Sequence, residues 1–191
     1  MRSILSRVYA LRIGSKDIVL SSVFASLYVA VNILQMFSPA GNPSVFGPIQ
    51  LRLADFLIAL SALFGKPVAI GVTIGCIIVN AFGPIGAIDI VFGSLANFLA
   101  AYAIMLLRKH RLAAYTVGSL IIAAIVGGGY LWLFFDPPSM LMFMPAPLAM
   151  FISIFLSSLI AITGFGYAVV KILSKPSIIN SLRAHGLKVL D

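Results

Sequence analysis

The stretch DIVLSSVFASLYVAVNILQMF, residues 17–37, has one charged side chain, at its first position, and is otherwise mostly apolar. Its length suits a membrane-spanning helix, which needs about 20 predominantly apolar residues to cross a bilayer. Basic residues precede this stretch, but its apolar run starts late, at Ile18, and lacks a clear small-residue cleavage site. We therefore expect a retained helix rather than a removable signal peptide.

The rest of the chain has the same character. Hydrophobic residues make up 61% of the 191 residues and charged residues only 9%, whereas a soluble domain carries about 25% charged residues. No polar stretch inside the chain is long enough to be a linker. The composition predicts an all-α membrane protein with a single transmembrane domain, residues 1–191.

Pro, Gly and basic residues divide the apolar sequence into segments. These predict a compact bundle of six transmembrane helices, at about residues 17–37, 51–64, 67–82, 88–107, 112–135 and 148–173. The second and third are shorter than a full lipid-exposed span. Because non-helical backbone at membrane depth is tolerated where it lines protein or water, we expect an open cavity at the outer end of the bundle.

The thirteen Lys and Arg residues indicate the orientation. With a cytoplasmic N-terminus and six helices, all of them except Arg52 fall on the cytoplasmic side, as the positive-inside rule predicts. The net charge of +8 is therefore interpreted as a topology signal, since no nucleic-acid-binding module is visible. We expect a multi-pass protein of the cell (plasma) membrane with both termini in the cytoplasm.

Charged residues inside membrane segments are costly and are candidates for function. Asp55 and Asp89 lie toward the outer side, where Arg52 is the opposing charge. Arg52 and Asp55 are three residues apart and can form a helix-surface pair, or they can hold a polar ligand. Asp89 is equally well explained as a helix N-terminal residue that complements the dipole.

Further polar and small residues accompany these charges. Asp89, Gly93, Asn97 and Ala101 recur every four residues and form one stripe of a helix. Asn80 and Gln50 add donors and acceptors at about the same depth, although buried amides also bond neighbouring helices. The predicted substrate-binding residues are therefore Gln50, Arg52, Asp55, Asn80, Asp89, Gly93 and Asn97.

The first helix carries a separate stripe of small residues at Ser22, Ser26 and Ala30. Such spacing permits close approach of another helix. Packing within the bundle is one interpretation, and docking of a partner subunit is the other.

Signatures of catalysis are absent from the sequence: it has no HExxH, GxSxG or phosphate-binding GK[ST] motif. The single Cys76 has no partner for a disulfide or a metal site and is interpreted as a packing residue. We expect no enzyme activity, no cofactor and no metal site.

Three stretches resemble a known family: GPIQLRLAD (47–55), GCIIVN (75–80) and above all GAIDIVFGSLA (86–96). They are similar to the queuosine-precursor transporter (QueT) family, substrate-binding S components of energy-coupling factor (ECF) transporters. The resemblance covers roughly residues 28–102. It implies a six-helix S component that binds a deazaguanine derivative or queuine from outside and docks on a transmembrane coupling subunit driven by two cytoplasmic ATPases.

The leading hypothesis is therefore an S component for a queuosine precursor, whose amine an acidic cavity would attract. Phe46, Phe92 and Trp132 are possible stacking partners for the base. The alternatives are an S component for another vitamin-like cargo, a membrane enzyme acting on a lipid or modified base, and a structural membrane subunit.

Overall fold

The computed structural model describes residues 14–37 and 52–190, and within them all regular structure is helical. The predicted all-α class is confirmed. Four helical segments are long and apolar enough to cross a membrane: Ser15–Met36, Asp89–Leu106, Arg108–Leu133 and Ala146–Leu173. Leu53–Phe64 and Lys66–Ala81 are shorter apolar helices. Six membrane crossings therefore remain a prediction, although all six predicted segments are helical.

Three of the four long segments are not uniform α-helices. The elements in chain order are α2 (Ser15–Met36), η1 (Leu53–Leu60), α4 (Ser61–Phe64), α5 (Lys66–Ala81), η2 (Asp89–Gly93), α6 (Ser94–Leu106), η3 (Arg108–His110), α7 (Arg111–Ile122), η4 (Ala123–Tyr130), η5 (Leu131–Leu133), η6 (Ser139–Leu141), α8 (Ala146–Ser158), η7 (Leu159–Gly166), α9 (Tyr167–Leu173) and α10 (Pro176–Ala184). η2, η4 and η7 are π-helical turns, which often occur at functional sites.

The contact between α2 and α5 is close because α5 presents glycines to it. A Cβ on Gly71 would lie 2.5 Å from the backbone oxygen of Ser21, and one on Gly75 would lie 2.8 Å from the Cβ of Tyr28. Small residues of this kind let helix backbones approach in membranes. The buried face of α2 therefore consists of Ser21, Phe24, Ala25 and Tyr28.

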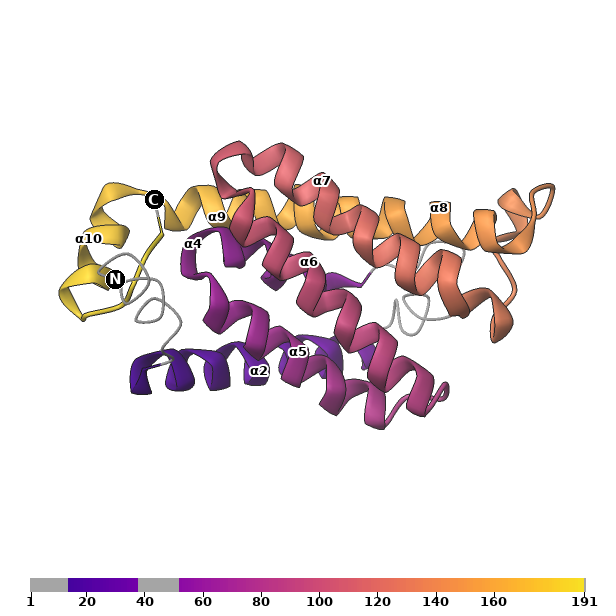
Figure 1. Ribbon diagram of the computed structural model, residues 1–191, viewed down its shortest axis with the longest axis horizontal. Coiled ribbons are helices and arrows are strands. Elements are labelled where there is room, and N and C mark those ends of the chain that lie inside the picture. The colour runs from indigo at the N-terminus through magenta and orange to yellow at the C-terminus, as the bar shows by residue number, and fades with distance from the viewer. Residues whose placement is uncertain (1–13, 38–51, 191) are drawn as a thin grey trace, which may run out of the picture.

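The chain reverses between α4 and α5 at Gly65, whose φ of 67° lies in the left-handed region that favours glycine. α4 is buried throughout, whereas α5 lies beside α2 (Figure 1) and exposes Ile74, Ile77 and Ile78. Large apolar side chains such as Val19, Leu34, Leu106 and Leu133 remain exposed on the outside. Such a surface suits contact with lipid rather than water.

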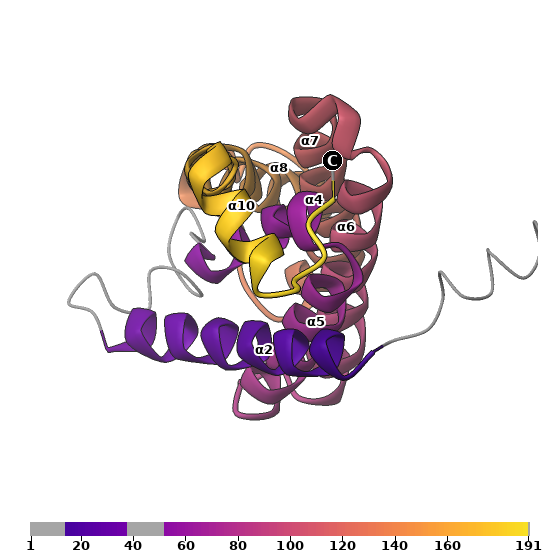
Figure 2. The ribbon, with the colours of Figure 1, turned by 90° about the vertical axis from the view of Figure 1, so that its left-hand side faces the viewer.

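The C-terminal segment forms an element that the sequence did not predict. α10 follows α9, and residues after it return to the other helices: Leu190 N donates to Leu63 O at 2.7 Å, and Lys188 Nζ lies 3.8 Å from an Asp17 carboxylate oxygen. Lys16 Nζ donates to the carbonyl oxygens of His185 and Gly186. Figure 2 looks onto this end and shows the segment crossing it.

These contacts bring the start of α2, the α4–α5 turn and the C-terminal segment together at one end of the bundle. This end of the bundle therefore carries Lys16, Lys66 and Lys188. Arg52 lies toward the opposite end, because it precedes η1, which runs directly into α4. The separation agrees with the predicted charge asymmetry. Which end faces the cytoplasm remains a prediction.

Candidate functional site

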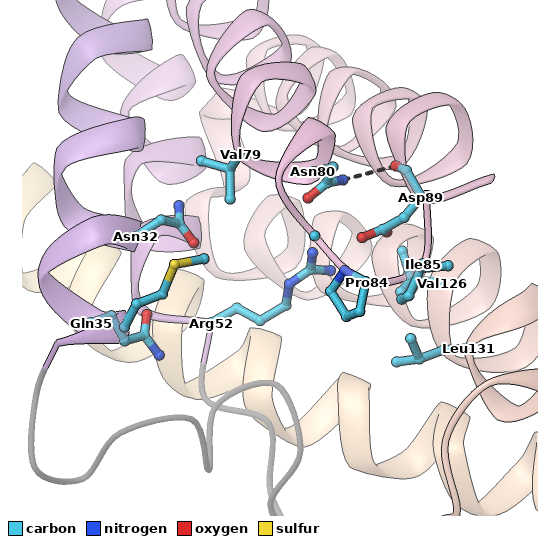
Figure 3. A pocket seen from close by; sticks show the side chains of 12 residues that line it. Asn32, Gln35, Arg52, Val79, Asn80, Pro84, Ile85, Asp89, Val126 and Leu131 are labelled. Atoms are coloured by element: carbon cyan, nitrogen blue, oxygen red, sulfur yellow. Dashed lines mark hydrogen bonds between the residues drawn. The ribbon is translucent and has the colours of Figure 1, made fainter. Parts of the chain in front are cut away.

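A pocket opens where α2, α5, η2 and η4 meet, at the end away from the C-terminal contacts (Figure 3). Its polar lining comes from helices far apart in the sequence, and its other walls are apolar. The lining residues are Asn32, Gln35, Met36, Arg52, Val79, Asn80, Gly83, Pro84, Ile85, Asp89, Val126 and Leu131. Three predicted site residues, Arg52, Asn80 and Asp89, thus share one pocket.

The backbone around Arg52 is held by side chains from two other helices. Arg52 N donates to Ser157 Oγ at 3.2 Å, and Leu53 N donates to Gln35 Oε1 at 3.2 Å. Both amides lie at the start of η1, where helical N–H groups have no partner within their own helix. These bonds fix the point from which the Arg52 side chain extends into the pocket.

The guanidinium of Arg52 is attracted electrostatically to both Asp55 and Asp89. Among the described residues, however, none accepts a hydrogen bond from its nitrogen atoms. A guanidinium has five N–H donors in a fixed planar arrangement. Arg52 therefore presents unused donors to whatever occupies the pocket.

Asp89 is held at its backbone and at its carboxylate. Its carbonyl oxygen accepts a hydrogen bond from Asn80 Nδ2 at 2.8 Å, and its Oδ1 accepts one from the hydroxyl of Tyr130 in η4. In the described residues the hydrogen bond to the Asp89 carboxylate comes from Tyr130 and not from an amide of its own helix. Asp89 is nine-tenths buried and lines the pocket.

Asn80 links the backbone of Asp89 to the helix before it. Besides its bond to Asp89, its Nδ2 lies 3.4 Å from Cys76 Sγ, and Cys76 is a buried free cysteine. With the amide nitrogen engaged, the Asn80 oxygen is the group that remains for the pocket. The packing role predicted for Cys76 agrees with this position.

Asp55 and Asn97 lie beneath the pocket rather than in its lining. Both are fully buried. The hydroxyl of Tyr28 donates to Asp55 Oδ1 at 3.1 Å and accepts from Asn97 Nδ2 at 2.9 Å. This chain joins η1, α2 and α6. The expected Arg52–Asp55 pair is thus an electrostatic attraction, and the hydrogen bond to Asp55 comes from Tyr28.

Gly93 completes the predicted stripe of Asp89, Gly93, Asn97 and Ala101, all of which are buried. A Cβ on Gly93 would lie 2.7 Å from Asp89 Oδ1 and 2.8 Å from Asn80 Nδ2. Glycine at this position therefore lets Asp89 and Asn80 approach the helix closely. Gly93 shapes the site without lining the pocket.

Other predicted residues fall elsewhere. Gln50 and Phe46 lie outside the described residues. Phe92 is 48% exposed, and Trp132 packs against the core with its Nε1 bonded to Gly128 O. Neither ring lines the pocket, so the structure does not support these two as stacking partners.

Four polar residues of the site were not predicted: Tyr28, Asn32, Gln35 and Tyr130. The first three are spaced by four and three residues along α2, so a polar stripe on the first helix was a usable signal. No comparable pattern marks Tyr130, which reaches Asp89 only through the packing of η4 against η2.

The small-residue stripe lies on the outside of the bundle. Ser22, Ser26 and Ala30 are exposed, while the neighbouring Ser21, Ala25 and Tyr28 pack against α5. Ser22 and Ser26 line a shallow groove with Ile70 and Ile74. Internal packing therefore does not account for the stripe within the described part of the chain.

No group of three or more His, Cys, Asp or Glu side chains in the described ranges is arranged to hold a metal ion. Four helical segments long and apolar enough to cross a membrane define the class, a multi-pass membrane protein. Residues 18–175 match the QueT transporter family, and the chain belongs to this family of transporters.

One curated relative is the queuosine precursor transporter QueT of Lactococcus lactis subsp. cremoris (strain MG1363). It is 39% identical over 83 residues, which cover 44% of this chain and 46% of the relative. The match therefore spans about half of the relative's length. No solved structure is significantly similar.

Proposed function

We propose that this protein is the substrate-binding S component of an ECF-type transporter and that its cargo is a queuosine precursor, a deazaguanine derivative or queuine. The pocket that joins Arg52, Asn80 and Asp89 carries the proposal, because it places unused polar groups in a member of a transporter family. The name of the curated relative supports this cargo.

The charges near the pocket favour the same cargo. Arg52 contributes one positive charge, and Asp55 and Asp89 contribute two negative ones, which leaves one net negative charge when all three are ionised. A base bearing a protonated amine fits this balance better than an anion does. In the proposed orientation the pocket faces outward and the basic end faces the cytoplasm.

Transport requires partners in this proposal. The chain would dock on a transmembrane coupling subunit driven by two cytoplasmic ATPases, with the exposed stripe of Ser22, Ser26 and Ala30 as the docking surface. Small side chains there would let a partner helix approach closely within the bilayer.

Calorimetric titration of the purified protein with deazaguanine, aminomethyl deazaguanine and queuine tests the cargo. We expect saturable binding of at least one of them. Binding of a different vitamin with none of the three bound would overturn the queuosine-precursor assignment.

Co-expression with the coupling subunit and both ATPases tests the assembly. We expect the four proteins to co-purify, and Ser26→Leu to weaken this association while cargo binding is retained. Ser26→Ala, which keeps a small side chain, is the matched control. Full uptake of the cargo by the chain alone would contradict the S-component role.

A further inference from the structure

Besides Asn32 and Gln35, the pocket is lined by three polar side chains that present two acceptors and one donor. Asp89 offers a carboxylate, and Asn80 offers an amide oxygen because its nitrogen is engaged by Asp89 O and Cys76 Sγ. Arg52 offers N–H groups that no described residue accepts. Figure 3 shows the side chains of Asn80 and Asp89 on one side of the pocket and the Arg52 guanidinium extending toward them.

The two acceptors are held in place before any ligand arrives, and the Arg52 side chain extends from an anchored backbone. Tyr130 orients the Asp89 carboxylate, Asn80 is fixed by two contacts, and the backbone at Arg52 is anchored by Ser157. A preorganised polar site recognises its partner with little loss of conformational entropy. Its donor and acceptor pattern therefore indicates the chemistry of the ligand.

The apolar part of the lining suits a flat ring. It is formed by the side chains of Met36, Val79, Pro84, Ile85, Val126 and Leu131. Small-molecule sites commonly combine such walls with a few polar groups that set the orientation of the ligand. A planar heterocycle would meet apolar groups on its faces and polar groups along one edge.

A guanine-type ring has an edge whose hydrogen-bonding groups are complementary to Asp89, Asn80 and Arg52. Its exocyclic amino group and the adjacent ring N–H are donors, and its carbonyl oxygen is an acceptor. Arginine donating to the guanine carbonyl is a frequent specific contact. Two acceptors and one donor in the pocket thus match two donors and one acceptor on the base.

We propose that Asp89 and Asn80 accept hydrogen bonds from the amino group and ring N–H of the base, while Arg52 donates to its carbonyl oxygen. The inference rests on the proposed function and goes beyond it, because it assigns Asp89 to the edge of the base rather than to the amine of its side chain. The donors and the acceptor of the ring then determine which ligands bind, and residues other than Asp89 contact the substituent on the ring.

Three ligands separate these roles: deazaguanine, the deaza analogue of hypoxanthine, which lacks the amino group, and aminomethyl deazaguanine. Titration of the wild-type protein is expected to show deazaguanine binding about tenfold or more tighter than the hypoxanthine analogue, since a buried acceptor is left unpaired by the latter. Equal binding of these two ligands would overturn the inference and leave the proposed cargo class standing.

The substitution Asp89→Asn shows whether Asp89 contacts the edge of the base or the amine of its substituent. If Asp89 accepts a hydrogen bond from the edge of the base, the variant lowers the affinities for deazaguanine and aminomethyl deazaguanine by the same factor. It also removes most of the preference for deazaguanine over the hypoxanthine analogue. A loss confined to the aminomethyl ligand would assign Asp89 to the amine and overturn the inference. Failure of every deazaguanine to bind the wild-type protein would instead refute the proposed function.

Two controls keep this test independent of folding. Asp136→Asn removes an exposed acid that does not line the pocket and is expected to leave all three affinities unchanged. Thermal unfolding without ligand reports whether Asp89→Asn retains the fold. If it does not, Asn80→Leu is the second variant. It keeps the approximate size of the side chain but removes the amide oxygen that accepts from the base, and it is expected to reduce the preference for deazaguanine over the hypoxanthine analogue. An unchanged preference would count against the inference.

Discussion

The hydroxyl of Tyr28 lies 3.1 Å from Oδ1 of Asp55 and donates a hydrogen bond to it in the interior of the bundle. The same hydroxyl accepts a hydrogen bond from Asn97. One side chain of α2 thereby connects η1, which begins next to Arg52, with α6, which continues from the helical turn that carries Asp89. The Tyr28 hydroxyl therefore ties the first helix to the two helical segments that begin beside Arg52 and Asp89.

Tyr28→Phe removes this hydroxyl and leaves Asp55 and Asn97 buried without it. Losing one hydrogen-bond partner of a buried polar group costs about 1–3 kcal/mol, so we expect a lower unfolding temperature. Thermal unfolding in detergent measures the change. Tyr102→Phe, at a 39% exposed position on α6, is the control and is expected to unfold with the wild type. Equal unfolding temperatures for all three proteins would contradict a stabilising role.

The attraction between Arg52 and Asp55 predicts non-additive substitutions. Arg52→Gln leaves the buried Asp55 carboxylate without its opposing charge, so we expect it to destabilise the fold. Asp55→Asn removes that carboxylate and should offset part of the loss in the double variant. The coupling is expected to be about 0.5–3 kcal/mol, the range found for residues that share a network.

Denaturant or thermal unfolding of the two single variants and the double variant gives this coupling. Strict additivity of the two single effects would show that the two charges act independently. The hydrogen bond from Tyr28 would then be the main support of Asp55.

Tyr130→Phe removes the hydrogen bond to Asp89 but retains the aromatic ring. The centroid of that ring lies 6.3 Å from the ring centroid of Phe92. A carboxylate that is no longer held must be ordered when a ligand binds. We expect deazaguanine affinity to fall by about tenfold, given that a hydrogen bond to a charged group contributes about 1.5–3 kcal/mol. Titration of Tyr130→Phe beside Tyr167→Phe, which lies outside the pocket lining, checks this effect.

The glycines of α5 predict a contrast in stability. Gly71→Ala places a Cβ 2.5 Å from Ser21 O and 2.6 Å from Phe24 Cβ, so α2 must move. Overpacking of this kind costs about 1–3 kcal/mol. Gly164→Ala has open space within 4 Å and is expected to be neutral or to stabilise by about 0.5–1 kcal/mol, because alanine is the better helix former. Unfolding temperatures ranked in the opposite order would contradict the close α2–α5 contact.

Hydropathy predicted the long helices well because their signal is local. The last predicted segment, residues 148–173, agrees with the continuous helical segment Ala146–Leu173. α10 was missed because a nine-residue helix outside the apolar segments carries no membrane signal. Its position depends on contacts with Lys16 and on packing of the segment that follows it.

The π-helical turns were not predicted either. A π turn changes which residues face the interior, and no periodicity of the apolar residues marked η2 or η4. Only packing of the two segments showed that Asp89 faces Tyr130. Because the stripe of Asp89, Gly93 and Asn97 is local in sequence, four-residue spacing was sufficient to predict that it would share one face.

By itself, the sequence determined the apolar helices, the placement of most basic residues outside them, and the small number of polar residues available for a site. Those properties follow from transfer free energies and helical periodicity, which act over neighbouring residues. Tertiary structure alone decided that Asp55 and Asn97 are joined by Tyr28 beneath the pocket, whereas Arg52, Asn80 and Asp89 open into it. That division depends on how each helix is rotated against its neighbours, and close packing around Gly71, Gly75 and Gly93 sets those rotations.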